Sequence, residues 1–288
     1  MLWLLFSILT AFSESMKDVF SKNNLKNLDE YAVAWGLRFF ALPFLLPLLL
    51  VIEIPPLGRQ FWIALLVSGT LNVITTILYM RAIKLSDLSL SVPMVTFTPL
   101  FLLLTSPLLV GEFPGIYGLA GIIFIVTGSY TLNIKERSRG YLAPFKALVR
   151  EKGPKLMLMV AFLWSITSNF DKLGVQDSSP IFWAIAANIY ISIFMLPILI
   201  LKSDQKLNQL THYIAPLLPV GLFTALTFIF QMTAINMTLV AYVISIKRTS
   251  VIMSVFWGYL IFKEKGLKER LFGSFLMIIG VVLITLHS

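Results

Sequence analysis

The sequence predicts an all-α integral membrane protein with ten transmembrane helices, arranged as two inverted five-helix repeats. Three observations predict this fold: the composition, about ten apolar runs of membrane-spanning length, and an internal repeat. Of the 288 residues, 58% are hydrophobic and 13% are charged, and the mean hydropathy is +0.87. A soluble domain is about 25% charged. The chain therefore carries more apolar surface than a soluble core can bury.

The apolar runs have the length that a membrane span requires. A hydrocarbon core of ~30 Å needs ~20 helical residues. The predicted spans are residues 2–19, 31–52, 61–83, 88–110, 116–134, 156–173, 181–201, 214–236, 240–265 and 267–286. The first run, MLWLLFSILTAFSE, has no positive n-region and no small-residue cleavage site. We therefore expect it to be a retained span and not a signal peptide.

The second half of the chain repeats the first. FLLPLLL at 44–50 matches FMLPILI at 194–200, and Lys22 matches Lys172, both at an offset of 150 residues. At an offset of 152, the matching residues are Glu112 and Glu264, Gly121 and Gly273, and Gly128 and Gly280. The expected division is a first repeat at 1–134, a basic linker at 135–155 and a second repeat at 156–288. An odd number of spans in each repeat inverts the second one, and inverted repeats place substrate sites near the midplane.

Basic residues gather in loops on one side of the predicted bundle. The central stretch 135–155 alone holds seven Lys and Arg residues, whereas the opposite side has little beyond Arg59 and Lys172. The positive-inside rule therefore predicts a cytoplasmic central loop and both termini outside. The expected location is the plasma (cytoplasmic or inner) membrane, which the chain crosses several times.

The ninth span interrupts its apolar run with Lys247 and Arg248. In an unbroken helix they lie ~12–14 Å from the outer side. A charge at that depth costs at least ~2.5–3.5 kcal/mol and marks a candidate functional site. The same count places Glu14 and Arg38 at a similar depth. The alternative is that the basic pair is structural and pairs with an acid to hold the bundle together.

Lys247 is the first candidate for ligand contact and Arg248 the second. Lys247 shares one helical stripe with small residues, whereas Arg248 lies ~100° round the helix among aliphatic side chains. Asn72, Asn169 and Asn188 also lie within predicted spans. Their side-chain amides either line one shared cavity or form separate helix–helix hydrogen bonds. The candidate substrate-binding residues are Lys247, Arg248, Arg38, Glu14, Ser250, Ser254, Asn72, Asn169 and Asn188.

Glu14 is the only acid expected deep in a span. It is a candidate proton carrier or a counter-ion to Arg38 or to the Lys247–Arg248 pair. Three deep cations against one deep acid leave a formal surplus of two positive charges. Such a surplus is costly in an empty site, so we expect an anionic or zwitterionic substrate.

The sequence contains no catalytic constellation. It has no cysteine, and its two histidines, His212 and His287, lie outside the spans or at the chain end. No catalytic residue, metal or cofactor is expected, and the net charge of +9 is attributed to membrane orientation, not to nucleic-acid binding. A membrane-embedded enzyme or a lipid-headgroup-binding scaffold is the alternative function.

Several segments resemble the drug/metabolite transporter superfamily, EamA type. PLLVGE at 107–112 is similar to the family's ending of the fourth span, and GYLIFKE at 258–264 is its counterpart in the second half. The segment that contains Trp164 and Lys172 is similar to the opening helix of an EamA repeat. The first half of the chain lacks this Trp, and Glu14 occupies the position equivalent to Trp164. The resemblance implies a central cavity, alternating access and transport of metabolites such as amino acids, sugars or nucleotide sugars. Together with the charge surplus, it predicts a secondary transporter of a small anionic or zwitterionic metabolite, such as an amino acid or organic acid. A coupling proton or a counter-substrate is a further expected partner.

Overall fold

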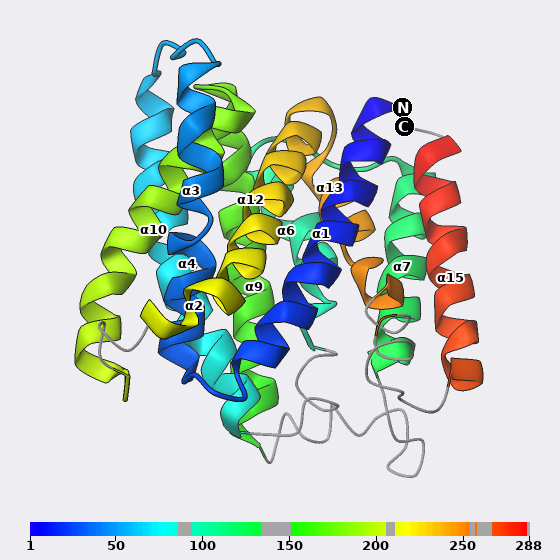
Figure 1. The fold of residues 1–288 in the computed structure, drawn as a ribbon. Helices are drawn as coiled ribbons and strands as arrows, with labels where there is room; N and C mark the ends of the chain where they lie inside the picture. Colours follow the sequence, from blue (N-terminus) through cyan, green and yellow to red (C-terminus); the bar gives the residue numbers. More distant parts are fainter. Residues whose placement is uncertain (86–93, 134–150, 206–210, 254–256, 258–266, 287–288) are drawn as a thin grey trace.

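In the computed structural model, residues 1–85, 94–133, 151–205, 211–253, 257 and 267–286 are described. Within these ranges all regular structure is helical, and the helices run side by side as a bundle (Figure 1). The all-helical class is confirmed. The elements are α1 (Leu2–Asn24), α2 (Glu30–Phe39), α3 (Leu42–Leu45), η1 (Leu46–Leu50), α4 (Arg59–Leu85), α6 (Thr98–Leu109), α7 (Ile116–Asn133), α9 (Lys152–Gln176), α10 (Pro180–Lys202), η3 (Thr211–Tyr213), α12 (Ile214–Met237), α13 (Val240–Lys247) and α15 (Leu267–Leu286).

Several helices are long and apolar enough to cross a bilayer. The segments that meet this length are Glu30–Leu50, Arg59–Tyr79, Pro180–Lys202 and Ile214–Met237, and three shorter helices are also apolar. Leu66, Ile193 and Phe275 are each about 60% exposed on the outside of the bundle, whereas many Ser, Thr and Asn side chains are buried inside. This polarity is the reverse of a soluble protein and fits a surface facing lipid. The chain is a multi-pass membrane protein, and the count of ten spans stays a prediction.

Local sequence explains where the helices begin. The Asp29 carboxylate accepts hydrogen bonds from the Tyr31 and Ala32 amides at 2.8 Å each, which caps α2. Ser179 caps α10, and Pro180 follows at its first position, where the missing N–H is not needed. The predicted span boundaries agree with these helices to within a few residues, where both are described.

Two predicted spans are broken and not continuous. The second turns at Phe40–Ala41 and continues as α3 and η1, which contain Pro43 and Pro47. Proline has no N–H to continue the helical ladder. The prediction of an unbroken helix through Lys247 and Arg248 is wrong, because α13 ends at Lys247 and helix resumes only at Ser250.

The break in the ninth span has a local cause. The amide and the hydroxyl of Thr249 both donate to the Ile246 carbonyl, at 2.9 and 2.7 Å. This three-residue closure replaces the four-residue ladder of an α-helix. The predicted stripe from Lys247 to Ser254 is therefore interrupted, and Ser254 itself lies outside the described residues. A turn at Thr96–Phe97, 152 residues earlier than Arg248–Thr249, precedes α6.

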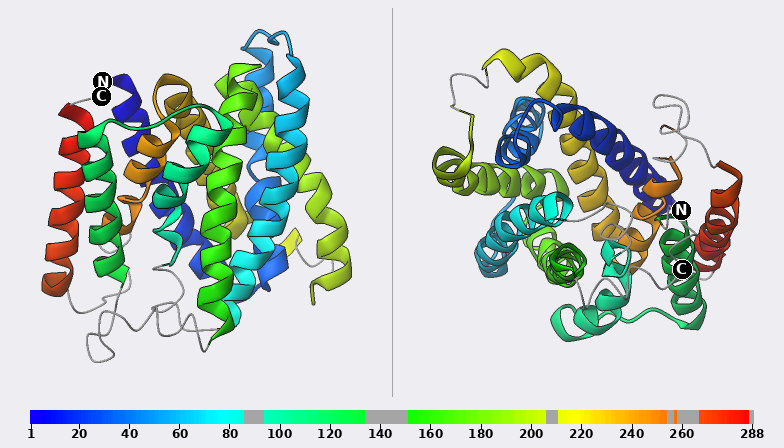
Figure 2. Two further views of the ribbon diagram at one scale, coloured as in Figure 1. Left: turned by 180° about the vertical axis from the view of Figure 1, so that it is seen from behind. Right: turned by 90° about the horizontal axis from the view of Figure 1, so that it is seen from below.

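The two halves are related by an inverted arrangement. α1 begins at the end of the bundle where both termini lie, and α9 begins at the opposite end (Figures 1 and 2). A Cβ added at Gly121 would lie 2.6 Å from the Gly280 carbonyl oxygen, and one at Gly128 would lie 2.5 Å from that of Gly273. Gly121 is equivalent to Gly273, and Gly128 to Gly280. The two contacts between α7 and α15 thus exchange roles, as a pseudo-two-fold axis requires.

Candidate functional site

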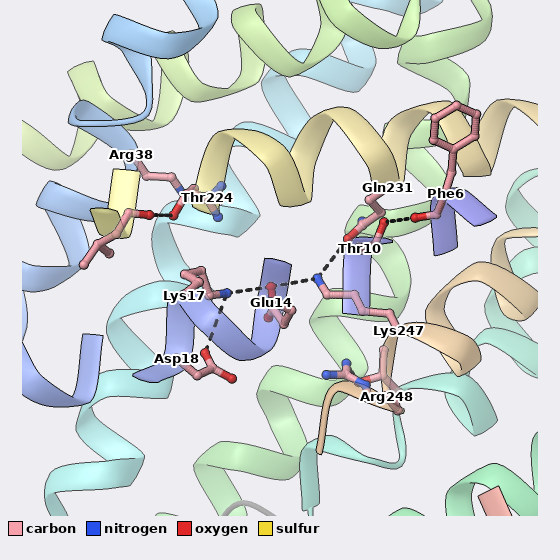
Figure 3. Close-up of polar contacts among 12 residues, drawn as sticks. Phe6, Thr10, Glu14, Lys17, Asp18, Arg38, Thr224, Gln231, Lys247 and Arg248 are labelled. Atoms are coloured by element: carbon pink, nitrogen blue, oxygen red, sulfur yellow. Dashed lines mark hydrogen bonds and ion pairs between the residues drawn. The ribbon is translucent and has the colours of Figure 1, made fainter. Parts of the chain in front are cut away.

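Glu14 of α1 lies between two ammonium groups inside the bundle (Figure 3). Its Oε2 is 2.7 Å from Lys17 Nζ and 3.6 Å from Lys247 Nζ. Lys247 also donates a 2.8 Å hydrogen bond to Gln231 Oε1 on α12. These side chains are largely buried, with Glu14 14% and Lys247 17% exposed. Lys247 is therefore held by an acid and an amide.

The predicted pairing of Glu14 with a deep cation is confirmed for Lys247. Neither Arg38 nor Arg248 forms an ion pair with Glu14. Sequence reasoning missed Lys17 and Gln231. Lys17 is three residues after Glu14 on one helix face, which is the spacing of intrahelical ion pairs. Gln231 is a lone amide in an apolar run, and that signal was available.

Arg248 is held by neutral groups at the helix break. Its Nη2 donates to Thr98 Oγ1 at 2.9 Å, and its Cζ lies 5.8 Å from the centre of the Trp164 ring. Trp164 is in turn fixed by a 3.1 Å hydrogen bond from Nε1 to Thr75 Oγ1. Within the described ranges no carboxylate pairs with Arg248, and its buried Nε has no partner. The guanidinium therefore retains unused donors.

Arg38, like Arg248, has no acid at ion-pair distance in the part of the chain that the structure describes. Its Nη1 donates to Asn188 Oδ1 at 3.5 Å, and its Cζ lies 4.6 Å from the centre of the Phe228 ring. A ring face attracts a cation but does not use its hydrogen-bond donors. Arg38 is thus held by one long hydrogen bond and one ring face.

The other predicted amides are bound to neighbouring helices or to their own helix. Asn72 donates to the carbonyl and hydroxyl of Ser68 at 3.0 and 3.1 Å. Asn169 of α9 accepts from Ser106 at 2.8 Å and donates to Thr105 of α6 at 3.0 Å. The contacts of Asn169 match the helix–helix alternative, whereas those of Asn72 lie within α4. Ser250 is buried at the residue where helix resumes.

A second buried acid lies outside the predicted set. Asp171 of α9 is 5% exposed, and its Oδ1 accepts hydrogen bonds from Ser68 Oγ at 2.6 Å and Trp183 Nε1 at 3.2 Å. The expectation that Glu14 is the only deep acid is wrong. In the described ranges, the cations Lys17, Arg38, Lys247 and Arg248 face the carboxylates Glu14, Asp18 and Asp171. The formal surplus falls from two positive charges to one.

A cross-repeat contact lies at the terminus-side end of the bundle. Glu112 follows Gly111, whose φ of 70° suits glycine. Lys172 of α9 pairs with Glu112 and donates to the Thr238 carbonyl at 2.9 Å. Glu112 Oε2 also accepts from the Val240 amide at 3.0 Å, which caps α13. This cluster joins the α6–α7 connection to α9 and to the turn between α12 and α13.

Metal-binding geometry is not found among the described side chains, where no three His, Cys, Asp or Glu residues gather. The arrangement is instead a bundle of apolar helices around buried charges, which is that of a multi-pass membrane protein. The sequence profile of the EamA-like transporter family matches residues 1–134 and 151–286. The chain belongs to the EamA-like transporter family, in agreement with its resemblance to the drug/metabolite transporter superfamily.

Comparison with solved structures shows that this fold also occurs in other proteins. Among 26 matching chains, one solved structure described only as "Crystal structure of protein" aligns with a TM-score of 0.74. The alignment covers 99% of this chain and 96% of that chain, at 14% sequence identity. A search of curated proteins found no match. The family membership and the shared fold establish a transporter architecture.

Proposed function

We propose that this protein is a secondary transporter that carries a small anionic or zwitterionic metabolite, such as an amino acid or organic acid, by alternating access. The proposal rests on the surroundings of Arg248. Its guanidinium lies inside the membrane-spanning bundle with a buried, unpartnered Nε and with no carboxylate pairing among the described residues. A charge so placed needs a partner. A carboxylate or phosphate supplies paired acceptors that match a guanidinium.

The contacts favour Arg248 over Lys247 as the primary anion contact. Lys247 already has Glu14 and Gln231 as partners, whereas Arg248 has one hydroxyl and one ring. The helix also breaks at Arg248–Thr249, and discontinuous helices border substrate sites in many transporters. In this proposal Arg248 holds the anionic group, and Lys247, Glu14 and Ser250 adjoin it. Glu14 then faces the ammonium of a zwitterionic substrate.

Alternating access is supported by the exchanged glycine contacts and by the Glu112–Lys172 contact. We propose that alternating access rearranges the contacts between the first repeat, 1–134, and the second, 156–288, which 135–155 joins. Opening the terminus-side end then requires parting Glu112 from Lys172 and from Val240. The loop charges support both termini outside the plasma membrane. A reporter fused after the last residue tests this orientation, and a cytoplasmic signal there would reverse it.

Uptake into sealed vesicles tests the function. Reconstituted protein should accumulate radiolabelled amino acids or organic acids only in closed proteoliposomes, and Arg248→Gln should abolish or greatly weaken this uptake. Arg81→Gln is the matched control, because Arg81 is an exposed arginine of α4. Conversion of the same compounds by detergent-solubilised protein, without a compartment, would instead support the enzyme alternative.

A further inference from the structure

Asp171 is a buried carboxylate held only by neutral hydrogen-bond donors. It lies five residues before the end of α9 at Gln176, ~8 Å from that end. Ser68 and Trp183 both donate to the same oxygen, Oδ1. Asn72 donates to Ser68 Oγ at 3.1 Å, which leaves the Ser68 hydroxyl hydrogen for Asp171. Oδ2 is then the oxygen that remains for a proton.

The charged surroundings of Asp171 are sparse. Arg38 of α2 and Lys247 of α13 attract it electrostatically, but neither forms an ion pair with it. The neighbouring Lys172 on α9 pairs with Glu112 instead. α6 and α12 carry no charged residue, and α4 and α10 present Ser68 and Trp183. An ionised carboxylate in such surroundings is costly, so the protonated form is accessible.

Glu14 differs from Asp171 in this respect. Lys17 and Lys247 lie on either side of its carboxylate, and two ammonium groups stabilise the ionised form. The sequence left Glu14 as either a proton carrier or a counter-ion, and its contacts favour the counter-ion. Asp171 is the deep acid whose contacts allow both protonation states.

We infer that Asp171 binds the coupling proton of transport, and that proton and anion are carried together. This inference rests on the proposed transport function. A proton from water on one side adds to Oδ2, and it is released to water on the other side. When Asp171 is ionised, its charge competes with an anionic substrate for Arg38. When it is protonated, that opposing charge is gone and Arg38 attracts the anion more strongly, so each ligand strengthens binding of the other.

Infrared difference spectroscopy tests proton binding without a substrate. Protein in lipid vesicles is titrated with acid, and the carbonyl band of protonated carboxylic acids is followed. Asp171→Asn should remove one such band, whereas Glu14→Gln should leave it in place. Ser68→Ala and Trp183→Phe each remove a donor to the ionised form, so the band should persist to a pH about one unit higher or more. A band unchanged in Asp171→Asn, or unmoved in both donor variants, would overturn the assignment.

Transport by the same variants tests coupling. The probe is a mixture of radiolabelled amino acids and organic acids. Wild-type vesicles should accumulate label when the outside is acidic, whereas Asp171→Asn should exchange label between preloaded vesicles but accumulate none. Accumulation driven by the pH gradient in Asp171→Asn would overturn the coupling role. No uptake by the wild type would overturn the proposed function, while the infrared titration would still decide whether Asp171 binds a proton.

Discussion

Arg38 of α2 and Asn188 of α10 occupy the same position in the two repeats, 150 residues apart, and they contact each other. Arg38 Nη1 lies 3.5 Å from Asn188 Oδ1. Each is the ninth residue of its helix, which places both ~12 Å from opposite ends of the bundle. A contact between equivalent residues lies on the pseudo-two-fold axis. The axis therefore passes through a cation and an amide near the midplane.

Exchanging these two side chains should preserve function better than losing the cation. Arg38→Asn removes a guanidinium from the axis and should weaken anion transport about 10- to 100-fold, since a hydrogen bond to a charged group contributes about 1.5–3 kcal/mol. Arg38→Asn with Asn188→Arg restores one cation and one amide and should recover part of the rate. The measurement is initial uptake in proteoliposomes. A double variant as slow as the single variant would contradict a role for the charge at the axis.

Glu14→Gln should destabilise the folded protein, because it leaves Lys17 and Lys247 facing each other without their shared acid. Breaking a buried pair costs about 3–5 kcal/mol, and the partial exposure of these side chains places the loss toward the lower end. A second change, Lys247→Gln, should restore part of the lost stability. The effects of Glu14→Gln and Arg38→Gln on stability should instead simply add. Unfolding measurements on this double-mutant cycle test the pairing. Strict additivity for Glu14 and Lys247 would argue against it.

Gly121→Ala and Gly280→Ala should each destabilise the protein by about 1–3 kcal/mol, because the added methyl group would press on a facing backbone. The two losses should be similar if the glycines serve equivalent contacts. Gly115→Ala is the control, since nothing lies within 4 Å of a Cβ added there. Equal stability of all three variants and the wild type in a thermal unfolding series would refute the close approach of α7 and α15.

A charge swap at Glu112 and Lys172 should recover only part of what the single changes lose. Glu112→Lys alone places two cations together and removes the cap of Val240. Adding Lys172→Glu restores an ion pair. The carboxylate is then on α9 at position 172, and no acceptor is restored at position 112 for the Val240 amide. The expected order of stability is wild type, double variant, single variants. A double variant as stable as the wild type would show that the cap of α13 contributes nothing.

The sequence predicted the fold well because its signals are local or periodic. Span length, the repeat offsets and the Gly landmarks all follow from composition and spacing, and the Gly121–Gly280 contact joins two of those landmarks. The break at Arg248–Thr249 was not predicted, because it depends on Thr249 closing a tight turn on Ile246. No proline or glycine marks that position.

The site was predicted less well, because contact partners depend on how helices rotate about their axes. Glu14, Lys247 and Arg248 were predicted from depth alone. Their ranking depends on contacts: Lys247 has an acid partner, whereas no carboxylate pairs with Arg248 among the described residues. Asp171 lies within the predicted span 156–173, beside Lys172 and two residues from its end, and it was not among the predicted candidates. In the structure they diverge, Lys172 toward Glu112 and Asp171 toward Ser68.

The central claim is that Arg248 is the anion contact of a transporter. The most direct measurement is a thermal-shift screen of purified wild type, Arg248→Gln and Arg81→Gln against anionic, zwitterionic, neutral and cationic metabolites, since a ligand of the folded state raises its stability. We expect stabilisation of the wild type and Arg81→Gln by anions or zwitterions only, and its loss in Arg248→Gln. Stabilisation by cationic or neutral compounds, or undiminished anion stabilisation of folded Arg248→Gln, would contradict this account.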